Sequence, residues 1–411
     1  METVVRRCAG LDVHKDSLVA CVRIVDENGE LQSFTQSFGT MVTDLLQLND
    51  WLASYEVTIV GMESTGVYWK PVYALLETDF TCWLLNAQHL HNVPGRKTDV
   101  ADASWIAQLV AHGLVRPSFV PPKKVRELRE LTRYRKALIQ ERTREAQRLH
   151  KILQDSGLKL SSVATDILGK SGRAILQALI DGTHDPDILA ELARGRLRRK
   201  IPLLRKALTA WFSPTHRILV SALLAHLEYL DESIEQFSSD IASLLTPFAQ
   251  AIDLLDSIPG VNRRSAEVFL AEFGADMSRF GSANRLASWA GMCPGNNESA
   301  GKHFSGKTRR GSKWLRTALT ESAEAAARKN GGYLRAQYTR IKGRHGHNKA
   351  ITAVAHSILV IAFHVLQRQE PYNELGGDYF VQRQNKDSYR KRLVTQLERM
   401  GYDVALSERA A

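Results

Sequence analysis

Four acidic residues in the N-terminal part of the chain are placed so that they could act together on a phosphodiester. Asp12 ends the first apolar run, and Glu63 directly follows a later one. Asp99 and Asp102 are three residues apart, so on a helix they share one face, with Cβ atoms roughly 5–6 Å apart. Carboxylates gathered in one place repel unless cations neutralise them, and such hard oxygen ligands suit Mg²⁺ or Mn²⁺. Two such ions about 3.5–4 Å apart can clamp the attacking and leaving oxygens of a phosphodiester.

The segments around these acids alternate between strand and helix patterns. Asn28-Gly29 is a strong hairpin turn between the second and third strand patterns. Strand patterns cover residues 9–13, 18–25, 31–38, 57–62 and 81–85, and helical patterns cover 45–52, 67–76 and 99–112. Three strands with a hairpin, then helix, strand, helix, strand and helix, is the order of RNase H-like domains.

In that order the first and fourth strands are neighbours, so their ends bring Asp12 and Glu63 together. The last helix can then place Asp99 and Asp102 across from them. We therefore predict an α/β, RNase H-like (RuvC-like) domain over residues 1–116 that holds divalent metal ions. Each acid taken singly is more simply explained as a helix cap or a surface charge, and the reading as a metal site depends on all four.

The rest of the chain is predicted to be all-α. Residues 117–122 (PSFVPP) form a linker, and residues 123–156 follow as one long helical pattern without Pro or Gly. Arg135 and Arg142 interrupt any strict heptad along it, which favours an antiparallel stalk over a long parallel coiled coil. A second helical run at about 216–245 is long enough to pack back along the first, so we assign residues 117–250 to a helical stalk region.

Residues 251–372 are predicted to form a mainly helical C-terminal domain, followed by a charged tail over 373–411. Residues 255–274 have the pattern of a helix-hairpin-helix, whose turn can offer backbone N–H groups to a phosphate. Residues 291–312 are rich in Gly, Asn and Ser and are expected to be a loop. Residues 342–349 (KGRHGHNK) are expected to be a second, basic loop.

The charge indicates a polyanionic partner. The net charge is +11, and residues 123–157 carry +6 of it, with 11 Lys or Arg and 5 Asp or Glu. An anionic membrane surface would favour a basic helix with Trp or Phe on its apolar side, and this segment has neither. No run of 18 apolar residues and no apolar signal segment is present, so we expect no membrane partner and a cytoplasmic location.

Metal or disulfide scaffolding by cysteine is not expected. The four cysteines are Cys8, Cys21, Cys82 and Cys293, and no two are spaced as Cys-x-x-Cys. They are expected to be small, buried or half-buried thiols.

Several separate blocks of the sequence resemble the DEDD-type transposases of bacterial insertion sequences, a family of bridge-RNA-guided recombinases. The N-terminal blocks are GLDVHKDSL (10–18), GMESTGVYWKPV (61–72) and NVPGRKTDVADASWIAQLVAHGL (92–114). The C-terminal blocks are IPGVNRRSAEVFLAEFG (258–274), RLASWAGMCPGNNESAGK (285–302), RRGSKWLRTAL (309–319) and QLERMGYDVALS (396–407). The blocks occur in the family's order and span nearly the whole chain.

The resemblance implies which residues act. Metal-binding acids of the family match Asp12, Glu63, Asp99 and Asp102. A nucleophilic serine in a Ser-Gly-Gly-Lys-like loop of the second domain matches Ser299, within Glu298-Ser299-Ala300-Gly301-Lys302. Ala300 replaces the usual first glycine, and Glu298 stands where the family often has Ser. Ser305, in Phe304-Ser305-Gly306-Lys307, is the alternative nucleophile.

The resemblance also implies a reaction and its partners. The serine would attack a DNA phosphate and form a phosphoserine link, with the acidic site of one protomer beside the serine of another. DNA donor ends and target would be the substrates, a guide (bridge) RNA would choose the site, and the protein would work as a dimer or tetramer on the bacterial nucleoid. Six basic residues around the serine would contact phosphates, namely Lys302, Lys307, Arg309, Arg310, Lys313 and Arg316.

Two other functions fit the same residues. One is an RNase H-like nuclease or junction resolvase that hydrolyses DNA with water, for which Ser299 is irrelevant. The other is a non-enzymatic nucleic-acid-binding protein whose acids are structural. A covalent protein–DNA adduct separates the first reading from both.

Overall fold

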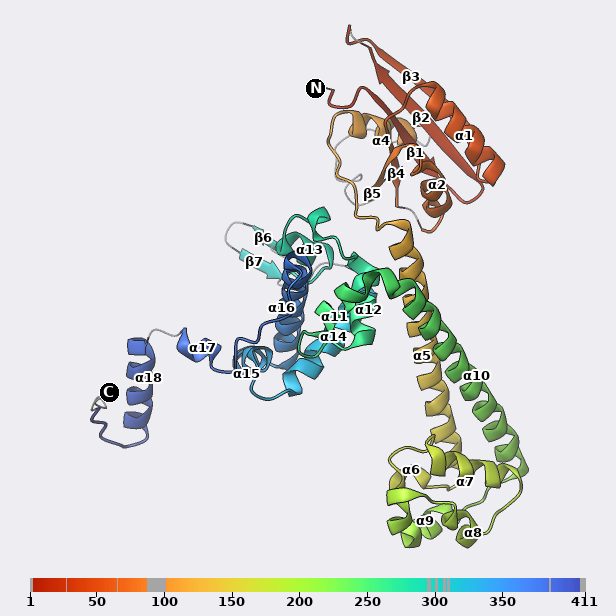
Figure 1. The fold of residues 1–411 in the computed structure, drawn as a ribbon, viewed down its shortest axis with the longest axis vertical. Helices are drawn as coiled ribbons and strands as arrows, with labels where there is room; N and C mark the ends of the chain where they lie inside the picture. The colour runs from red at the N-terminus through yellow and green to blue at the C-terminus, as the bar shows by residue number, and fades with distance from the viewer. Residues whose placement is uncertain are drawn as a thin grey trace. The chain divides into compact units, whose positions relative to one another are not determined.

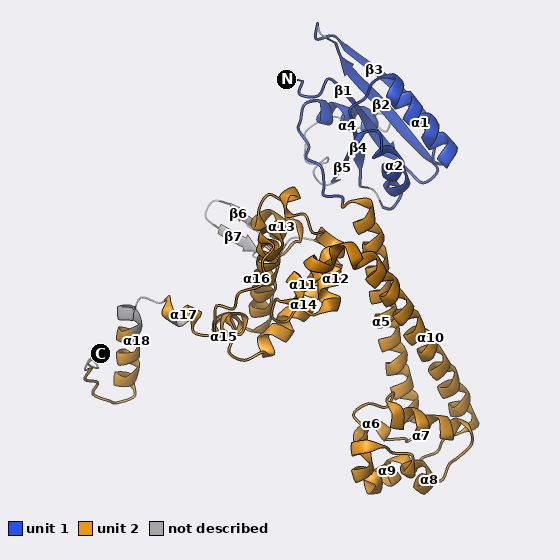
Figure 2. Cartoon of the chain, in the orientation of Figure 1, with its two compact units in different colours: residues 1–120 blue, residues 121–411 orange. Residues whose placement is uncertain are grey.

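The computed structural model describes residues 3–26, 28–64, 66–86, 101–293, 297–299, 302–305, 308, 311–383 and 386–406. The chain divides into two compact units, Met1–Val120 and Pro121–Ala411 (Figure 2). The finer division of the second unit into a stalk region, a C-terminal domain and a tail stays a prediction.

The first unit is built on a five-stranded sheet with the order β3-β2-β1-β4-β5. β1 pairs antiparallel with β2, and β2 with β3, whereas β1 pairs parallel with β4, and β4 with β5. The strands are β1 (Arg7–Val13), β2 (Ser17–Val25), β3 (Leu31–Gly39), β4 (Ile59–Glu63) and β5 (Thr81–Leu85). This strand order confirms the predicted RNase H-like domain.

The turn between β2 and β3 lies at Asn28-Gly29, as predicted. Gly29 has a φ of 84°, a left-handed conformation that glycine adopts without strain. The carboxylate of Asp26 accepts hydrogen bonds from the backbone N–H groups of Asn28 (2.9 Å) and Glu30 (2.8 Å). Asp26 and Gly29 therefore stabilise the turn that joins β2 to β3.

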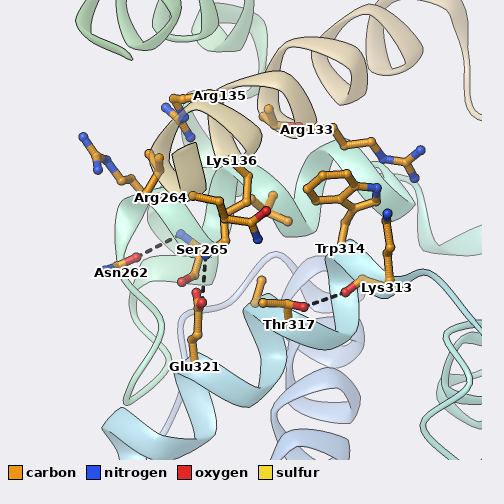
Figure 3. Close-up of a pocket in the computed structure, with 15 residues that line it drawn as sticks. Arg133, Arg135, Lys136, Asn262, Arg264, Ser265, Lys313, Trp314, Thr317 and Glu321 are labelled. Carbon is orange, nitrogen blue, oxygen red and sulfur yellow. Dashed lines mark hydrogen bonds and ion pairs between the residues drawn. The ribbon is translucent and has the colours of Figure 1, made fainter. Parts of the chain in front are cut away.

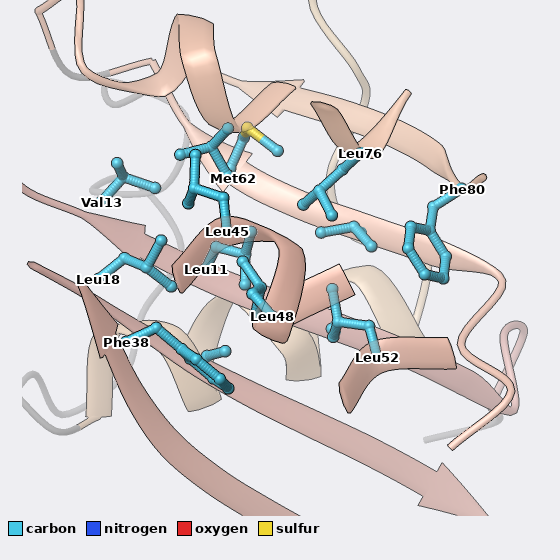
Figure 4. Packing of buried hydrophobic residues seen from close by; sticks show 14 of the residues in the cluster. Leu11, Val13, Leu18, Phe38, Leu45, Leu48, Leu52, Met62, Leu76 and Phe80 are labelled. Carbon is cyan, nitrogen blue, oxygen red and sulfur yellow. The ribbon is translucent and has the colours of Figure 1, made fainter. Parts of the chain in front are cut away.

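Helices cover both faces of the sheet (Figure 1). On one face, α1 (Val42–Ser54) and α2 (Trp69–Leu76) pack on the main apolar core, where Leu45 and Leu48 of α1 lie over Leu11 and Met62 (Figure 4). On the other face, α4 (Ala101–Ala111) buries Ile106, Leu109 and Val110 against Cys8 and Leu85.

The stalk of the second unit consists of two long helices that run side by side (Figure 1). These are α5 (Lys123–Asp155) and α10 (Pro214–Leu245), with Leu138 of α5 packed on Leu230 and Ile234 of α10. The predicted antiparallel stalk is thereby confirmed. Small elements between the two helices form their own core around Ile175 and Leu204, namely α6 (Leu160–Val163), α7 (Lys170–Ile180), α8 (Pro186–Glu191), η1 (Gly195–Lys200) and α9 (Ile201–Leu208).

The remaining helices of the unit include a helix-hairpin-helix, as predicted. It is formed by α11 (Ala249–Asp256) and α12 (Arg263–Phe273). In its turn Gly260 has a φ of 88°, and a Cβ there would lie 2.3 Å from the backbone oxygen of Ser322. The following elements are η3 (Met277–Arg279), α13 (Ala283–Trp289), α14 (Lys313–Arg328), α15 (Tyr333–His345), α16 (His347–Arg368), α17 (Tyr379–Gln382) and α18 (Lys386–Arg399), and η2 (Thr246–Phe248) precedes α11.

Two predicted loops are wrong. The segment 291–312 contains an antiparallel hairpin of β6 (Asn297–Ser299) and β7 (Lys302–Ser305). Strands this short, rich in polar residues, give no alternation of apolar and polar side chains to detect. The segment 342–349 is the end of α15 and the start of α16, separated by Gly346 with a φ of 81°. One left-handed glycine ends one helix and lets the next begin at once.

α16 is long and apolar enough to cross a membrane by composition alone, and more than half of its apolar window is buried inside the structure. It packs against α13 and α14 and buries Val354, Ile358 and Phe363. Packing in a protein core therefore accounts for its hydropathy. The cysteines are free and buried or half-buried, as predicted, and burial raises the pKa of the Cys8 and Cys82 thiols to about 12.

A buried carboxylate joins three helices of the second unit. Glu272 of α12, whose side chain is 1% exposed, accepts two hydrogen bonds of 2.8 Å from Arg133 of α5. It also accepts one of 2.9 Å from Ser312, the N-cap of α14. Burial lowers the pKa of the neighbouring Arg129 to about 10, and the charge of Glu272 opposes that shift.

We expect Glu272→Ala to lower the free energy of unfolding by roughly 2–3 kcal/mol, because it leaves the half-buried guanidinium of Arg133 without its carboxylate. Urea denaturation of the full chain measures this. The control is Glu321→Ala, since Glu321 pairs with Lys136 but is 56% exposed. Its loss should cost roughly 0–1 kcal/mol. Equal effects of the two substitutions would contradict the role assigned to Glu272.

Candidate catalytic acids and serine hairpin

Asp12 and Glu63 end neighbouring parallel strands. Leu11 of β1 lies beside Met62 of β4, so Asp12 and Glu63 occupy the next step of the same ladder. Leu11 and Met62 point into the core beneath α1 and α2. Because side chains alternate along a strand, Asp12 and Glu63 point to the opposite face, which α4 covers.

α4 lies very close to this face because two glycines are paired beneath it. Gly10 and Gly61 are register partners, and each lies two residues before an acid. A Cβ on Gly10 would lie 2.2 Å from the backbone oxygen of Ala103 and 2.4 Å from the backbone nitrogen of Ala107. No residue with a side chain fits there without moving the backbone of α4.

The direction of α4 places Asp102 at the same edge of the sheet as Asp12. The backbone N–H groups of Val4 and Val5, just before β1, both donate to the carbonyl oxygen of Ala111, at 2.8 and 3.0 Å. The C-terminal end of α4 therefore lies by the start of β1, and its first turn lies toward the end of β1. Asp102, half-buried, is in that first turn.

Of the four predicted acids, the structure brings Asp12, Glu63 and Asp102 to one edge of one sheet face. Asp99 falls within residues 87–100, which lie outside the described residues. Within the part of the chain that the structure describes, no three His, Cys, Asp or Glu side chains are grouped closely enough to hold a metal ion. Repulsion between carboxylates opposes their closer approach unless a cation lies between them.

His14 is a polar neighbour of Asp12. Its Nε2 lies 3.2 Å from Oδ2 of Asp12, and the two side chains are 64% and 17% exposed. The imidazole can hold the orientation of the Asp12 carboxylate while remaining open to solvent. The contact between His14 and Asp12 depends on the turn after β1.

The predicted nucleophile lies at the turn of the β6–β7 hairpin. In the ladder, Ser299 is opposite Lys302, and Ser305 is opposite Asn297. Ser299 is therefore the last residue of β6 before the turn, whereas Ser305 ends β7 at the opposite end of the ladder. The hairpin distinguishes two serines that the sequence alone left as alternatives.

Close contacts hold the flanks of the hairpin together. A Cβ on Gly311, just before α14, would lie 2.2 Å from the carbonyl oxygen of Ala290. Arg316 of α14 donates a hydrogen bond of 2.8 Å from Nη2 to the carbonyl oxygen of Gly291. Arg316 thus supports the segment that leads into the hairpin.

Of the other predicted phosphate-binding residues, the structure describes Lys313 and the backbone of Lys302. Lys313, in the first turn of α14, is exposed. The backbone of Lys302 lies in β7. Lys307, Arg309 and Arg310 fall outside the described residues.

These features define a two-part protein in which an RNase H-like domain precedes a mainly helical unit. Residues 9–157 match the family model of DEDD transposases of the IS110 type, described as "Transposase". Residues 252–339 match the model of the "Transposase IS116/IS110/IS902 family". The chain belongs to the IS110 family of insertion-sequence transposases and is a DNA transposase, which confirms the resemblance found in its sequence.

Individual proteins agree with this assignment. The transposase for insertion sequence element IS1111A of Coxiella burnetii is 25% identical, over 88% of this chain and 90% of that protein. The transposase for IS1328 of Yersinia enterocolitica is 24% identical, over 77% and 86%. A solved structure of Thermus thermophilus RuvC is similar over 27% of this chain and 99% of its own, with 15% identity and a TM-score of 0.21. The strand order, not this last similarity, establishes the RNase H-like fold.

We expect Gly10→Ala to push α4 off the sheet, because its Cβ would collide with backbone atoms of Ala103 and Ala107. Thermal melting should show a loss of roughly 1–3 kcal/mol, and DNA cleavage should fall because Asp102 moves with the helix. Gly343→Ala in α15 is the control, since nothing lies within 4 Å of the added Cβ. It should be neutral or stabilise by about 0.5–1 kcal/mol. A Gly10→Ala protein that melts and cleaves like the parent would overturn this account of α4.

Proposed function

We propose that this transposase cleaves and exchanges DNA strands with a serine nucleophile and a divalent metal site. Asp12, Glu63, Asp99 and Asp102 hold Mg²⁺ or Mn²⁺, and Ser299 attacks the DNA phosphate. The observation that carries this proposal is that the elements bearing Asp12, Glu63 and Asp102 bring these residues to the same edge of the sheet, on the face covered by α4.

The donor set fits a hard divalent cation. Asp12 and Glu63 follow the register pair Leu11–Met62 at the same step of neighbouring strands, and all members are carboxylates, the ligands that Mg²⁺ and Mn²⁺ prefer. When bound, such ions polarise a phosphoryl oxygen and stabilise developing negative charge. His14, 3.2 Å from Asp12, holds that carboxylate in place.

The serine chemistry balances without an added energy source. The Oγ of Ser299 attacks phosphorus, a serine–phosphate ester forms, and one phosphorus–oxygen bond of the DNA breaks to release a DNA hydroxyl. A DNA hydroxyl from another end then attacks the ester, restores a phosphodiester and frees the serine. A serine hydroxyl needs activation to act as a nucleophile. In the backbone ladder of the hairpin, the partner of Ser299 is Lys302.

The acids and the serine belong to different compact units, Met1–Val120 and Pro121–Ala411. This separation supports a composite site in which the acids of one protomer act beside the serine of another, within a dimer or tetramer. Lys302, Lys307, Arg309, Arg310, Lys313 and Arg316 would neutralise backbone phosphates there. Such contacts carry little sequence information, so we assign the choice of target to pairing with a guide RNA, acting on DNA of the cytoplasmic nucleoid.

We expect Asp12→Asn to reduce strand cleavage by about 10³-fold or more while leaving DNA binding near that of the parent. Cleavage of labelled target DNA in the presence of guide RNA and Mg²⁺ measures the first, and filter binding the second. Asp50→Asn, on the exposed surface of α1 over the opposite sheet face, is the matched control. EDTA should abolish cleavage by the parent. Full cleavage by Asp12→Asn would show that this carboxylate takes no part in the reaction and would overturn the proposed metal site.

Ser299→Ala should abolish the protein–DNA adduct seen on a denaturing gel, whereas Ser305→Ala should retain it. The reason is that only the hydroxyl at the hairpin turn is assigned as the nucleophile. Loss of the adduct in Ser305→Ala alone would move the nucleophile to that residue. DNA cleavage by the parent without any adduct would instead show a nuclease that uses water.

A further inference from the structure

A cavity of about 330 Å³ opens between α5, α12 and α14 in the second unit (Figure 3). Five of its described lining residues are cationic, and Glu321 is the one carboxylate among them. The cationic residues are Arg133, Arg135, Lys136, Arg264 and Lys313. The cavity is therefore rich in positive charge, and all of its lining residues belong to the second unit.

Three of these cations already have carboxylate partners. Arg135 Nη2 lies 2.6 Å from Oε2 of Glu267, with both side chains buried. Lys136 Nζ lies 2.7 Å from Oε1 of Glu321. Arg133 is held by Glu272, as described above. These pairs shape the wall of the cavity more than they attract a ligand.

Arg264 and Lys313 are different. Both are exposed, and no ion pair joins either one to a carboxylate within the described ranges. Figure 3 shows Lys313 beside Trp314 at one end of the cavity and Arg264 at the other. These two side chains can bind an anion without breaking an existing pair.

Trp314 gives the cavity an aromatic wall. Trp314 is half-buried and lines the cavity. Lys313 Nζ lies 4.9 Å and Arg133 Cζ 6.0 Å from the centre of its ring. An indole next to cations is the combination with which proteins hold single strands, because bases stack on the ring and phosphates meet the charges.

We propose that this cavity binds one unpaired nucleotide of a nucleic-acid strand, with its base against Trp314 and its phosphate at Lys313 or Arg264. A volume of about 330 Å³ is at the small end of ligand sites and suits a single nucleotide. Paired bases in a duplex already stack on both faces, so a duplex cannot use the indole. An acidic peptide would satisfy the cations but not the ring.

The inference rests on the proposed function only in that the strand is one that the transposase handles. Binding requires neither the metal site nor Ser299, so it is measured on the full chain in EDTA, where no cleavage occurs. The probes are fluorescein-labelled 12-nucleotide oligo(dT), the matching oligo(U) and a 12-base-pair DNA duplex, followed by fluorescence anisotropy.

We expect Trp314→Ala to weaken single-strand binding about tenfold and to leave duplex binding unchanged, with Trp314→Phe retaining most of the affinity. Arg264→Ala, at an exposed position, should weaken single-strand binding several-fold and reduce its salt dependence. Trp211→Ala is the matched control, because Trp211 is 88% exposed and does not line the cavity. The oligo(dT) and oligo(U) arms show whether the strand is DNA or RNA.

The proposal fails if Trp314→Ala and Arg264→Ala melt like the parent and bind single strands equally well. It also fails if Trp314→Ala weakens duplex and single-strand binding to the same degree. Asp12→Asn and Ser299→Ala should bind the single strands normally. Loss of catalysis in those variants and loss of strand binding in the cavity variants are thus separate results.

Discussion

The contact between α4 and the β1–β4 pair determines where the acids of the first unit lie. Gly10 and Gly61 face α4 side by side, and the missing Cβ on Gly10 lets the helix backbone come within van der Waals reach of the strand. With its last turn bonded to Val4 and Val5, the helix has one direction available. The acids two residues after each glycine, and the first turn of α4, then share an edge. Backbone packing thus positions the candidate site before any ion binds.

In the second unit, buried carboxylates on α12 determine how the neighbouring helices are placed. Glu267 and Glu272 bind arginines of α5, and Glu272 also binds the N-cap serine of α14. Buried ion pairs contribute little net stability, because desolvation offsets their attraction, but losing one partner is costly. Their effect here is to fix the angles at which three helices meet. Those angles create the cavity lined by Trp314 and orient the start of α14, which follows the serine hairpin.

The sequence predicted the features that local patterns encode. Apolar alternation and the Asn28-Gly29 turn gave the strand order, and a segment free of Pro and Gly gave α5. The sequence did not predict the hairpin that contains Ser299, because short strands of polar residues show no alternation of apolar and polar side chains. The sequence did not predict the cavity either, because its lining residues are distant in sequence, as Arg133 and Trp314 are. The close approach at Gly10 and Gly61 could have been predicted from the sequence, since each glycine stands two residues before an acid and so lies on the same face of its strand.

The acids and the serine that we propose as catalytic lie in separate units, so the proposed mechanism needs a unit bearing the acids to act together with a unit bearing the serine, from one copy or from two. For the two units to act on one DNA strand, at least one of them must hold that strand. The proposed cavity of the second unit, which also carries Ser299, would bind one unpaired nucleotide. It would thereby hold the strand until the acids of a first unit reach the phosphate. Strand binding and metal chemistry would then depend on different residues of the chain, so each could be changed without the other.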